Sequence, residues 1–486
     1  MRSWRIRVSA FLCGVTWLCA AAGHAGAAVQ WPEHELARHA RAWFEMLAGD
    51  ETAARAFFAE HMAAQPQNPV PIETRLQRRT ATLERTGGLT PLEVVEDDGA
   101  RLGVRCKAGN GDEVVAMFEG EAAPPHRLLG VRLEARPPGA GGEAPRPAGP
   151  ALEDADAVKQ ARAYLDSRAA SGAWSGAALI ARGDEVLVSG AWGEADRAKK
   201  IPNTTATRFN VGSIGKMFTR TAIAQLAQAG KLSLDDPLSR FLPDFPHADS
   251  ITIAMLCAHR SGVGDIFNDA YEATDKAKLR HNHDYLALIR DQPLWFAPGT
   301  SQRYSNGGYV LLGEVIAKAS GEDYYDYLAK HVFAPAGMTA TAALVEGDGT
   351  KGVARGYTAK GGGEGERDNV ATRPARGSAA GGSYSTLADL LAFDRALLGA
   401  RLCDPAWSAW VTGGPRPGGA NAPLAPESPS FGFAGGAPGL NAEWTREGDV
   451  VMLVLTNRDP EVARPTVQGL QDIVRRMKPS ASRRPS

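Results

Sequence analysis

The sequence predicts a two-domain α+β protein, in which a small domain of helices and strands precedes a larger domain built around an antiparallel sheet. Apolar residues repeat at helical spacing between residues 36 and 85, and short apolar or alternating runs follow up to residue 133. A stretch rich in proline and glycine, residues 137–150, then interrupts the pattern as an interdomain linker does. Beyond it, strand-like runs lie at both ends of the chain with helical patterns between them, which predicts one sheet flanked by helices and an all-helical insertion.

The N-terminus has the pattern of a cleaved signal peptide. Arg2, Arg5 and Arg7 precede an apolar run over residues 8–22, and the small residues 25–27 (Ala-Gly-Ala) form a cleavage site. We therefore predict a signal peptide over residues 1–27 and a periplasmic or secreted mature protein. No later apolar run is long enough to cross a membrane, so no membrane span is expected after cleavage.

The small domain is predicted over residues 28–136. Helical patterns cover residues 36–47, 53–62 (with Asp50 as the cap) and 72–85, the last ended by two glycines. Strand-like runs follow at 92–95, 102–106, 114–118 and 128–133. Helices followed by a strand meander resemble the small NTF2-like (nuclear-transport-factor-like) domain, which precedes the catalytic part of some secreted serine hydrolases.

The larger domain is predicted over residues 151–478, followed by a disordered tail at 479–486. A helix is expected at 157–168, and a hairpin at 176–181 and 185–190. Strands are expected at 442–446 and 450–456, and a last helix at 465–477. The sheet would thus be assembled from the two ends of the domain.

Charge and cysteine content exclude several function classes. Lys+Arg 54 against Asp+Glu 55 leaves a nearly neutral chain, so nucleic acid is not an expected partner. Once the signal peptide is removed, Cys106, Cys257 and Cys403 remain, without the paired spacing of a disulfide framework or a zinc site. Each is predicted to be a small buried hydrophobe.

A histidine pair in the first helix has the wrong spacing for a metal site. His34 and His39 are five residues apart, whereas zinc-binding helices need histidines four apart on one face. We interpret both as solvated helix residues, and likewise His281 and His283 in a polar segment. No metal and no cofactor is predicted.

The chain has a single Ser-x-x-Lys sequence, Ser213 to Lys216. Apolar spacing predicts a helix from Ser213 to Ala229, capped by Gly230, so that the lysine lies one turn above the serine. Burial at the positive end of a helix lowers a lysine pKa, and a neutral lysine can take the serine proton. The pattern alone is weak, because an N-cap serine with an exposed lysine also fits it.

A second polar cluster follows a Pro-Gly turn, where Tyr304 and Asn306 precede a predicted helix at 310–319. A tyrosine hydroxyl near a lysine can lose its proton more readily and relay protons. An asparagine can hold the lysine and a substrate amide at once. A turn with a packing tyrosine is the alternative interpretation.

Together these motifs resemble the serine β-lactamase and penicillin-binding-protein superfamily, closest to class C β-lactamases and related esterases and D-Ala-D-Ala peptidases. The resemblance extends over residues 157–459. It implies a β-lactamase/transpeptidase-like fold. It also implies Ser213 as the acyl-enzyme nucleophile, Lys216 as its base, Tyr304 as the shared acid/base and Asn306 as the substrate amide anchor.

The third motif of that family is altered here. A Lys-Thr-Gly or His-x-Gly is expected on an inner strand, and Phe433 occupies the place of the lysine or histidine. Gly435 and Gly436 retain the small backbone, and the N–H of Gly436 could complete an oxyanion hole with that of Ser213. A phenylalanine cannot bind a substrate carboxylate, which weakens a β-lactamase or carboxypeptidase assignment and leaves an esterase-like activity.

Two function classes remain. The first is a serine hydrolase that acts on a small acyl or peptide-like substrate. The second is a catalytically weak or inactive descendant that binds peptidoglycan fragments or a protein partner. The intact serine, lysine, tyrosine and asparagine favour the enzyme. The altered third motif removes one electrostatic donor, which costs about 10²–10³ in rate, whereas loss of the nucleophile would cost far more. An α/β-hydrolase is excluded because no Gly-x-Ser-x-Gly is present.

Overall fold

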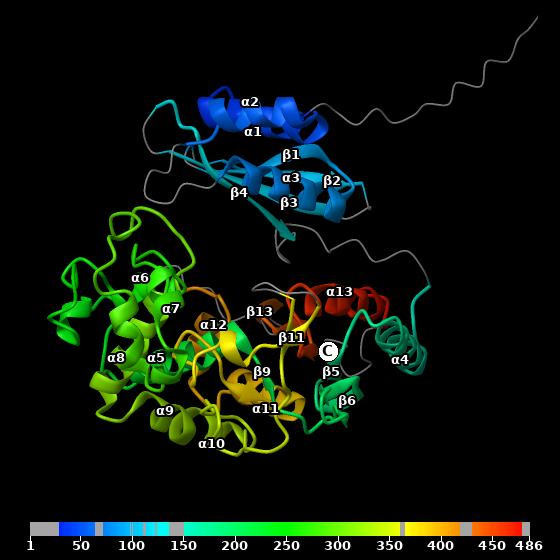
Figure 1. Cartoon of the computed structure of the whole chain (residues 1–486), viewed down its shortest axis with the longest axis vertical. Helices are drawn as coiled ribbons and strands as arrows, with labels where there is room; N and C mark the ends of the chain where they lie inside the picture. The colour runs from blue at the N-terminus through cyan, green and yellow to red at the C-terminus, as the bar shows by residue number, and fades with distance from the viewer. Residues whose placement is uncertain are drawn as a thin grey trace, which may run out of the picture. The chain divides into compact units, whose positions relative to one another are not determined.

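The computed structural model describes residues 29–63, 71–97, 99, 101–109, 113–121, 124–135, 150–359, 365–417 and 430–478. The chain divides into two compact units, one within residues 1–142 and one within residues 143–486 (Figure 1). The predicted signal peptide, the tail and the linker apart from Pro150 lie outside the described residues. None of the described helices is long and apolar enough to span a membrane.

The described residues of the N-terminal unit form three helices followed by a four-stranded antiparallel meander, β1-β2-β3-β4, as predicted. On the first helix, the ring of Trp43 packs edge-on and that of Phe44 packs tilted against Phe118 of the third strand. All three side chains belong to the hydrophobic core of this unit. The elements are α1 (Glu35–Ala48), α2 (Glu51–Glu60), α3 (Ile72–Thr86), β1 (Leu89–Asp97), β2 (Arg101–Ala108), β3 (Glu113–Gly120) and β4 (Leu128–Ala135).

The histidines of α1 correct one prediction. His34 is the N-cap, and its ring accepts a hydrogen bond from Ala37 N at 3.2 Å. His39, predicted to be solvated, is buried, because it lies on the same helix face as the apolar side chains three and four residues away. Its ring nitrogens lie 2.9 Å from His61 Nδ1 and 3.0 Å from the Pro125 carbonyl. His281 and His283 are exposed, as expected.

The C-terminal unit is organised around a five-stranded antiparallel sheet in the order β13-β14-β15-β5-β6. Its strands come from both ends of the unit, which confirms the predicted assembly of the sheet from the chain ends. They are β5 (Gly176–Arg182), β6 (Glu185–Trp192), β13 (Phe431–Ala437), β14 (Leu440–Glu447) and β15 (Val450–Thr456). β15 is buried along its whole length, as its continuous apolar sequence requires.

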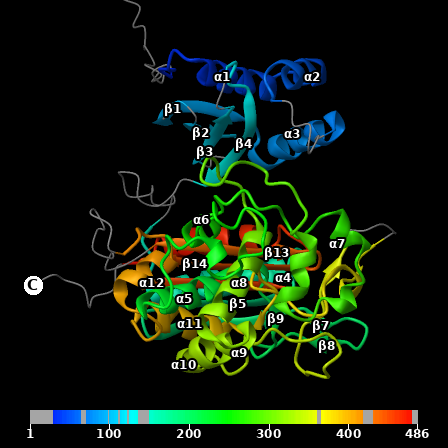
Figure 2. The same cartoon turned by 90° about the vertical axis from the view of Figure 1, so that its left-hand side faces the viewer.

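Helices cover both faces of this sheet. Alternate residues such as Ile180 and Met452 face α4 (Asp154–Ala170) and α13 (Ala463–Val474) on one side. Their neighbours Leu179 and Leu453 face the helical insertion on the other side. Figure 2 shows helices of the insertion, including α5 and α8, in front of strands β5 and β14.

The insertion consists mainly of helices, with short two- or three-residue strands. Its helices are α5 (Gly215–Gln228), α6 (Ile253–Cys257), α7 (Asp269–Ala273), α8 (Asn306–Ser320), α9 (Tyr324–Tyr327), α10 (Ala334–Ala336), α11 (Leu387–Leu398) and α12 (Pro405–Val411). Segments of 3-10 helix are Gly212–Ile214, Leu238–Arg240, Lys276–Lys278, Asn282–Leu288 and Val370–Thr372, and Leu328–Phe333 is a π-helical segment. The short strands are β7 (Glu194–Asp196), β8 (Ile201–Pro202), β9 (Phe209–Asn210), β10 (Tyr357–Thr358), β11 (Arg367–Asp368) and β12 (Tyr384–Ser385).

A buried ion pair fastens α11 to the sheet. Asp394 is fully buried and accepts hydrogen bonds from Arg446 and, at 3.1 Å, from Trp444 Nε1. Such a pair is expensive to break, because either partner alone would be an uncompensated buried charge. Cys106, Cys257 and Cys403 are buried free thiols, as predicted.

Candidate active site

Ser213 lies on the helical turn Gly212–Ile214, which leads directly into α5. The preceding strand β9 ends at Asn210, whose side-chain oxygen accepts a hydrogen bond from Gly212 N at 2.9 Å. Gly212 has a φ of +50°, a left-handed conformation that favours glycine. The predicted placement of the serine at the helix start, with Lys216 one turn on, is confirmed.

Lys216 is buried, with 5% of its surface exposed, and its amine has three oxygen neighbours. Nζ lies 2.7 Å from Asn306 Oδ1, 2.5 Å from the Ala380 carbonyl and 3.2 Å from Ser213 Oγ. A neutral amine has two N–H groups and one lone pair. The carboxamide and carbonyl oxygens can only accept, so they take the two N–H groups and leave the lone pair for the serine proton.

The charge state of Lys216 supports that assignment. Burial lowers the pKa of Lys216 to about 7, because the ammonium form loses its hydration, while the negative charge of Asp265 opposes the shift. Near neutral pH a large share of the molecules therefore carries an uncharged amine beside Ser213, as the sequence predicted.

Tyr304 places its hydroxyl 2.7 Å from Ser213 Oγ. Its ring centroid lies 4.7 Å from Lys216 Nζ and 4.6 Å from the ring of His259. Burial raises the pKa of Tyr304 to about 12, and the hydrogen bond with Ser213 offsets only part of that rise. The net shift of the Tyr304 pKa is thus upward beside the lysine. Tyr304 stays protonated at neutral pH and can donate a proton.

Asn306 is the first residue of α8, whereas the helix was predicted to begin at Val310. Ser305 caps the helix by accepting a hydrogen bond from Gly308 N at 2.9 Å. The two glycines after Asn306 concealed this start, because glycine is a poor helix former. A side chain at Gly307 would lie 2.3 Å from the Gly264 carbonyl, so close packing requires glycine there.

The carboxamide of Asn306 has a partner on each side. Its oxygen faces Lys216, and its nitrogen donates to the Asp265 carboxylate at 3.0 and 3.1 Å. The predicted contact with the lysine is present, but the nitrogen expected to bind a substrate amide already has a protein acceptor. Asp265 escaped prediction from the sequence because its role depends on a contact across 41 residues.

Strand β13 approaches the serine turn at backbone distance. A Cβ built on Gly435 would lie 2.0 Å from the Val211 carbonyl oxygen and 2.9 Å from Ser213 N. A Cβ built on Gly212 would lie 2.9 Å from Gly436 N. Only glycines allow this approach, and it brings the backbone N–H groups predicted for the oxyanion hole into one neighbourhood.

Phe433 belongs to an aromatic cluster on the inner face of the sheet. Its ring centroid lies 5.3 Å from that of Phe431 and 5.5 Å from that of Trp444. The nearby guanidinium of Arg446 is committed to Asp394, so it does not replace the missing cation of the third motif. The side chain at this position is apolar and packed.

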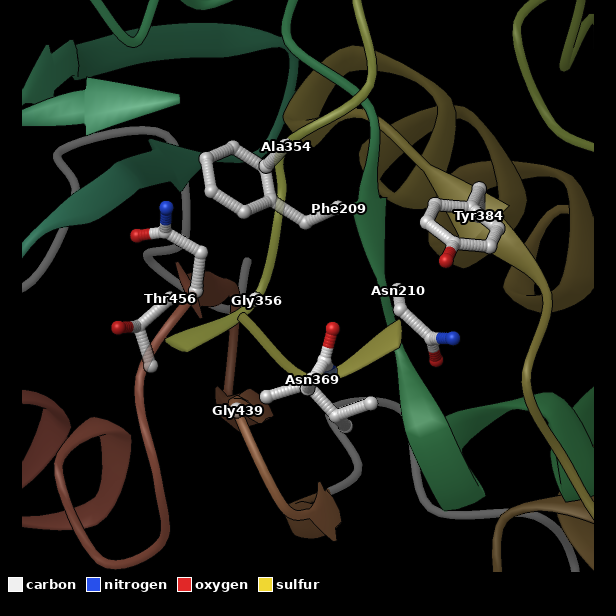
Figure 3. Close-up of a pocket in the computed structure, with 10 residues that line it drawn as sticks. Phe209, Asn210, Ala354, Gly356, Asn369, Tyr384, Gly439 and Thr456 are labelled. Atoms are coloured by element: carbon white, nitrogen blue, oxygen red, sulfur yellow. The ribbon is translucent and has the colours of Figure 1, made fainter. Parts of the chain in front are cut away.

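A small cavity is lined by both residues of strand β9, and Ser213 is not among its lining residues (Figure 3). Its volume of about 10 Å³ has space for about one water molecule, too little for an acyl substrate. Its lining residues are Phe209, Asn210, Ala354, Gly356, Asn369, Tyr384, Gly439, Leu440, Thr456 and Asn457. Among the described residues, no group of three or more His, Cys, Asp or Glu side chains is placed to hold a metal ion.

The backbone of residues 379–381 and His259 are further parts of the site that received no role from the sequence. The Ala380 carbonyl accepts from Lys216, and Gly381 Cα would lie 3.0 Å from a Cβ on Gly215. The His259 ring lies tilted against the ring of Tyr304, and its Nδ1 accepts a hydrogen bond from Ser305 N at 3.2 Å. Both segments lie within residues 157–459, the range that resembles the penicillin-binding-protein superfamily, but no chemical pattern in their sequence indicated these contacts.

A serine at a helix start, a buried lysine one turn on and a tyrosine hydroxyl on the serine oxygen form a site typical of serine hydrolases with a Ser-x-x-Lys motif. The sequence profile of the Beta-lactamase family matches residues 158–473, well over half of the chain. The chain belongs to this family, within the serine β-lactamase and penicillin-binding-protein superfamily.

Individual relatives agree with that assignment. Penicillin-binding protein 4* of Bacillus subtilis is 35% identical over 170 residues, which are 35% of this chain and 38% of that protein. The penicillin-binding protein from Bacillus halodurans is similar in structure, with a TM-score of 0.57 and 27% identity over 64% of this chain and 98% of its own. The D-amino acid amidase from Ochrobactrum anthropi SV3, complexed with L-phenylalanine amide, has a TM-score of 0.55 and 26% identity, over 66% and 97% of the two chains. The sequence match to penicillin-binding protein 4* thus spans about two fifths of that protein's length.

Proposed function

We propose that this protein is a periplasmic or secreted serine hydrolase that works through an acyl-enzyme on Ser213. The observation that carries the proposal is the convergence of two proton-handling groups on one oxygen. Ser213 Oγ lies 2.7 Å from the Tyr304 hydroxyl and 3.2 Å from Lys216 Nζ. The N-terminal sequence pattern supports the location.

In the proposed acylation step, Ser213 Oγ attacks the carbonyl carbon of the substrate while Lys216 Nζ takes the serine proton. The resulting oxyanion would be stabilised by the backbone N–H groups of Ser213 and Gly436. Tyr304 then gives its hydroxyl proton to the leaving oxygen or nitrogen and receives the proton held by Lys216. The lysine returns to its neutral form, and the acyl group stays on the serine.

Deacylation would use the same groups in reverse order. A water molecule gives one proton to the neutral amine of Lys216 as it attacks the acyl carbon, and Ser213 Oγ recovers that proton, directly or through the Tyr304 hydroxyl, as it leaves. No further ionisable side chain is needed for either step. The lysine and tyrosine therefore serve both half-reactions.

The proposed substrate is an ester or amide that carries no carboxylate near the third motif. Phe433 stands where the family has a lysine or histidine, and its ring packs on Trp444. An apolar side chain there favours contact with an uncharged group and leaves a carboxylate without a partner. This supports an esterase-like activity over β-lactam or D-Ala-D-Ala hydrolysis.

Intact-mass measurement tests the proposal. The mature chain is incubated with a fluorophosphonate and, separately, with a penicillin, beside a Ser213→Ala variant. A Ser213-dependent adduct with the fluorophosphonate alone is expected. Adducts with both reagents would support a penicillin-recognising enzyme instead, despite Phe433.

A binding protein is the second candidate, and one observation favours it. The Asn306 nitrogen, which would anchor a substrate amide, donates to Asp265. Absence of an adduct with either reagent would contradict the enzyme proposal. It would favour a protein that binds peptidoglycan fragments or a protein partner on the same fold.

A further inference from the structure

Asp265 is the charged side chain that joins the start of α8 to the serine site. Its carboxylate accepts hydrogen bonds from Asn306 N at 3.2 Å, from Asn306 Nδ2 at 3.0 and 3.1 Å, and from Phe267 N at 3.0 Å. Its own backbone carbonyl accepts from Asn268 and Gln292 side chains at 2.9 and 3.0 Å. The residue is thus held from both its side chain and its backbone.

We propose that Asp265 is a positioning residue for acylation: it holds the Asn306 carboxamide oxygen on Lys216 and supplies the negative charge that faces the lysine. This inference deepens the proposed hydrolase function and rests on it. Asp265 does not touch the serine oxygen, so it acts through its neighbours rather than as a catalytic residue.

The orientation of the Asn306 carboxamide follows from what each neighbour can offer. A carboxylate can only accept hydrogen bonds, so Asp265 binds the NH₂ end of the carboxamide. The oxygen end is then turned toward Lys216 Nζ, 2.7 Å away. The reversed carboxamide would place its oxygen against the carboxylate and its N–H groups against the amine. With a neutral residue at position 265, both orientations would have partners.

The segment that carries Asp265 is packed against α8 by its backbone. The Gly264 carbonyl accepts from Ser305 Oγ at 2.9 Å, and a Cβ on Gly307 would lie 2.3 Å from that carbonyl. A Cβ on Gly264 would lie 2.1 Å from the Gln292 side-chain oxygen. Bare backbone on both sides fixes the distance between the carboxylate and the first turn of the helix.

The charge of Asp265 acts on a lysine that burial drives toward neutrality. Burial lowers the pKa of Lys216 to about 7, and Asp265 works in the opposite direction. Tyr304, with a pKa raised to about 12, and His259, with a pKa lowered to about 4, both face the lysine uncharged at neutral pH. The ring of Tyr309 also faces it, 5.3 Å from Nζ, and stays protonated because burial raises its pKa.

One more cation bears on the carboxylate. Arg303 directly precedes Tyr304, and its guanidinium carbon lies 3.8 Å from the ring centroid of Trp295. Burial lowers the pKa of Arg303 and the charge of Asp265 raises it.

Removing the Asp265 charge would leave Lys216 without the negative charge that favours its ammonium form, so the Lys216 pKa would fall further.

The test compares Asp265→Asn and Asp265→Glu with the wild type in the full chain lacking only its predicted signal peptide. The rate of fluorophosphonate labelling is measured from pH 5 to pH 10, with thermal melting alongside. Asp404→Asn is the matched control, because Asp404 caps α12 by accepting from Trp407 N at 2.9 Å and takes no part in the serine site.

For Asp265→Asn we expect labelling about 10–100-fold slower at pH 8, because a carboxamide free to turn no longer orients the lysine. We also expect the acid limb of its profile to move to lower pH. Asp265→Glu, which keeps the charge, should retain the acid limb of the wild type. The control should match the wild type in both respects. If the acid limb of Asp265→Asn stays at the same pH as that of the wild type, the proposal is overturned. This holds also if the variant melts at a lower temperature, because a loss of stability alone would slow labelling without moving the acid limb.

A second measurement separates this inference from the proposed function. If the wild type is not labelled at all, the hydrolase proposal fails. The titration of Lys216 is then followed by NMR in protein with ¹³C-labelled lysine. A lower titration midpoint in Asp265→Asn than in the wild type supports the role of Asp265, and equal midpoints overturn it. The same NMR titration also decides the matter if only a fraction of the variant folds.

Discussion

The ionisation of Lys216 makes the pH dependence of acylation the sharpest prediction of this structure. The pKa of Lys216 is lowered to about 7, and only the neutral amine can accept the Ser213 proton. Below that pH each unit reduces the neutral fraction about tenfold, so about one site in a hundred is active at pH 5. Above about pH 8 nearly all sites carry the neutral amine and the rate should level off.

A fluorophosphonate is a suitable reagent, because fluoride departs without needing a proton and the rate reports activation of Ser213. Labelling is followed by intact mass from pH 5 to pH 10. Lys318→Ala serves as the control, since Lys318 is exposed in the last turn of α8, away from the serine. It should leave both rate and profile unchanged.

Two results would refute the reasoning. A rate that is flat from pH 5 to pH 8 would mean that the lysine is not the base. A rate that keeps rising above pH 9 would point to Tyr304, whose pKa is raised to about 12, as the group that must lose its proton. Tyr304→Phe should keep the acid limb and slow turnover of an ester by about 10²–10⁴, the usual contribution of a proton donor.

Three further predictions concern the sheet. Gly435→Ala should abolish labelling and lower the melting temperature, because its Cβ would overlap the backbone beside Ser213, whereas Gly432→Ala on the same strand meets a side chain only at 3.6 Å and should be tolerated in the same two assays. Phe433→His should introduce penicillin adducts that the wild type lacks, detected by intact mass. Asp394→Ala should reduce the free energy of unfolding by about 3–5 kcal/mol in urea titrations, because it leaves a buried arginine unpaired. As the control, Asp235→Ala removes the exposed ion pair with Arg416 and should reduce the free energy of unfolding by about 0–1 kcal/mol. Equal reductions in the two variants would contradict the expectation that the buried pair contributes more than the exposed one.

The fold could be predicted because its signals are local. β15 is an unbroken apolar run and α5 has apolar residues at helical spacing, so each element can be located without knowing its partners. The order of strands and helices then leaves few arrangements for the sheet. The placement of Lys216 one turn beyond Ser213 was predicted for the same reason, whereas their roles were implied by the family resemblance.

The rest of the site depends on contacts between distant segments. Asp265 and Asn306 are 41 residues apart, and the Ala380 carbonyl reaches Lys216 across 164 residues. A backbone carbonyl leaves no trace in the sequence. The start of α8 was misplaced because Gly307 is there for packing against Gly264, a requirement that outweighs helix propensity. His39 was misassigned because a histidine on an apolar face can be satisfied by a second histidine, which spacing alone does not reveal.

Phe433 separates two tasks that the family resemblance assigns to the third motif. The proposed base is Lys216. Burial favours its neutral form and the charge of Asp265 opposes that form, and neither effect involves strand β13. The strand contributes backbone through Gly435 and Gly436, which Phe433 leaves intact. What Phe433 removes is a polar or cationic partner for the far end of the substrate. Serine activation should therefore survive while carboxylate recognition is lost, so a protein labelled by a fluorophosphonate and untouched by penicillin is the expected pairing rather than a contradiction.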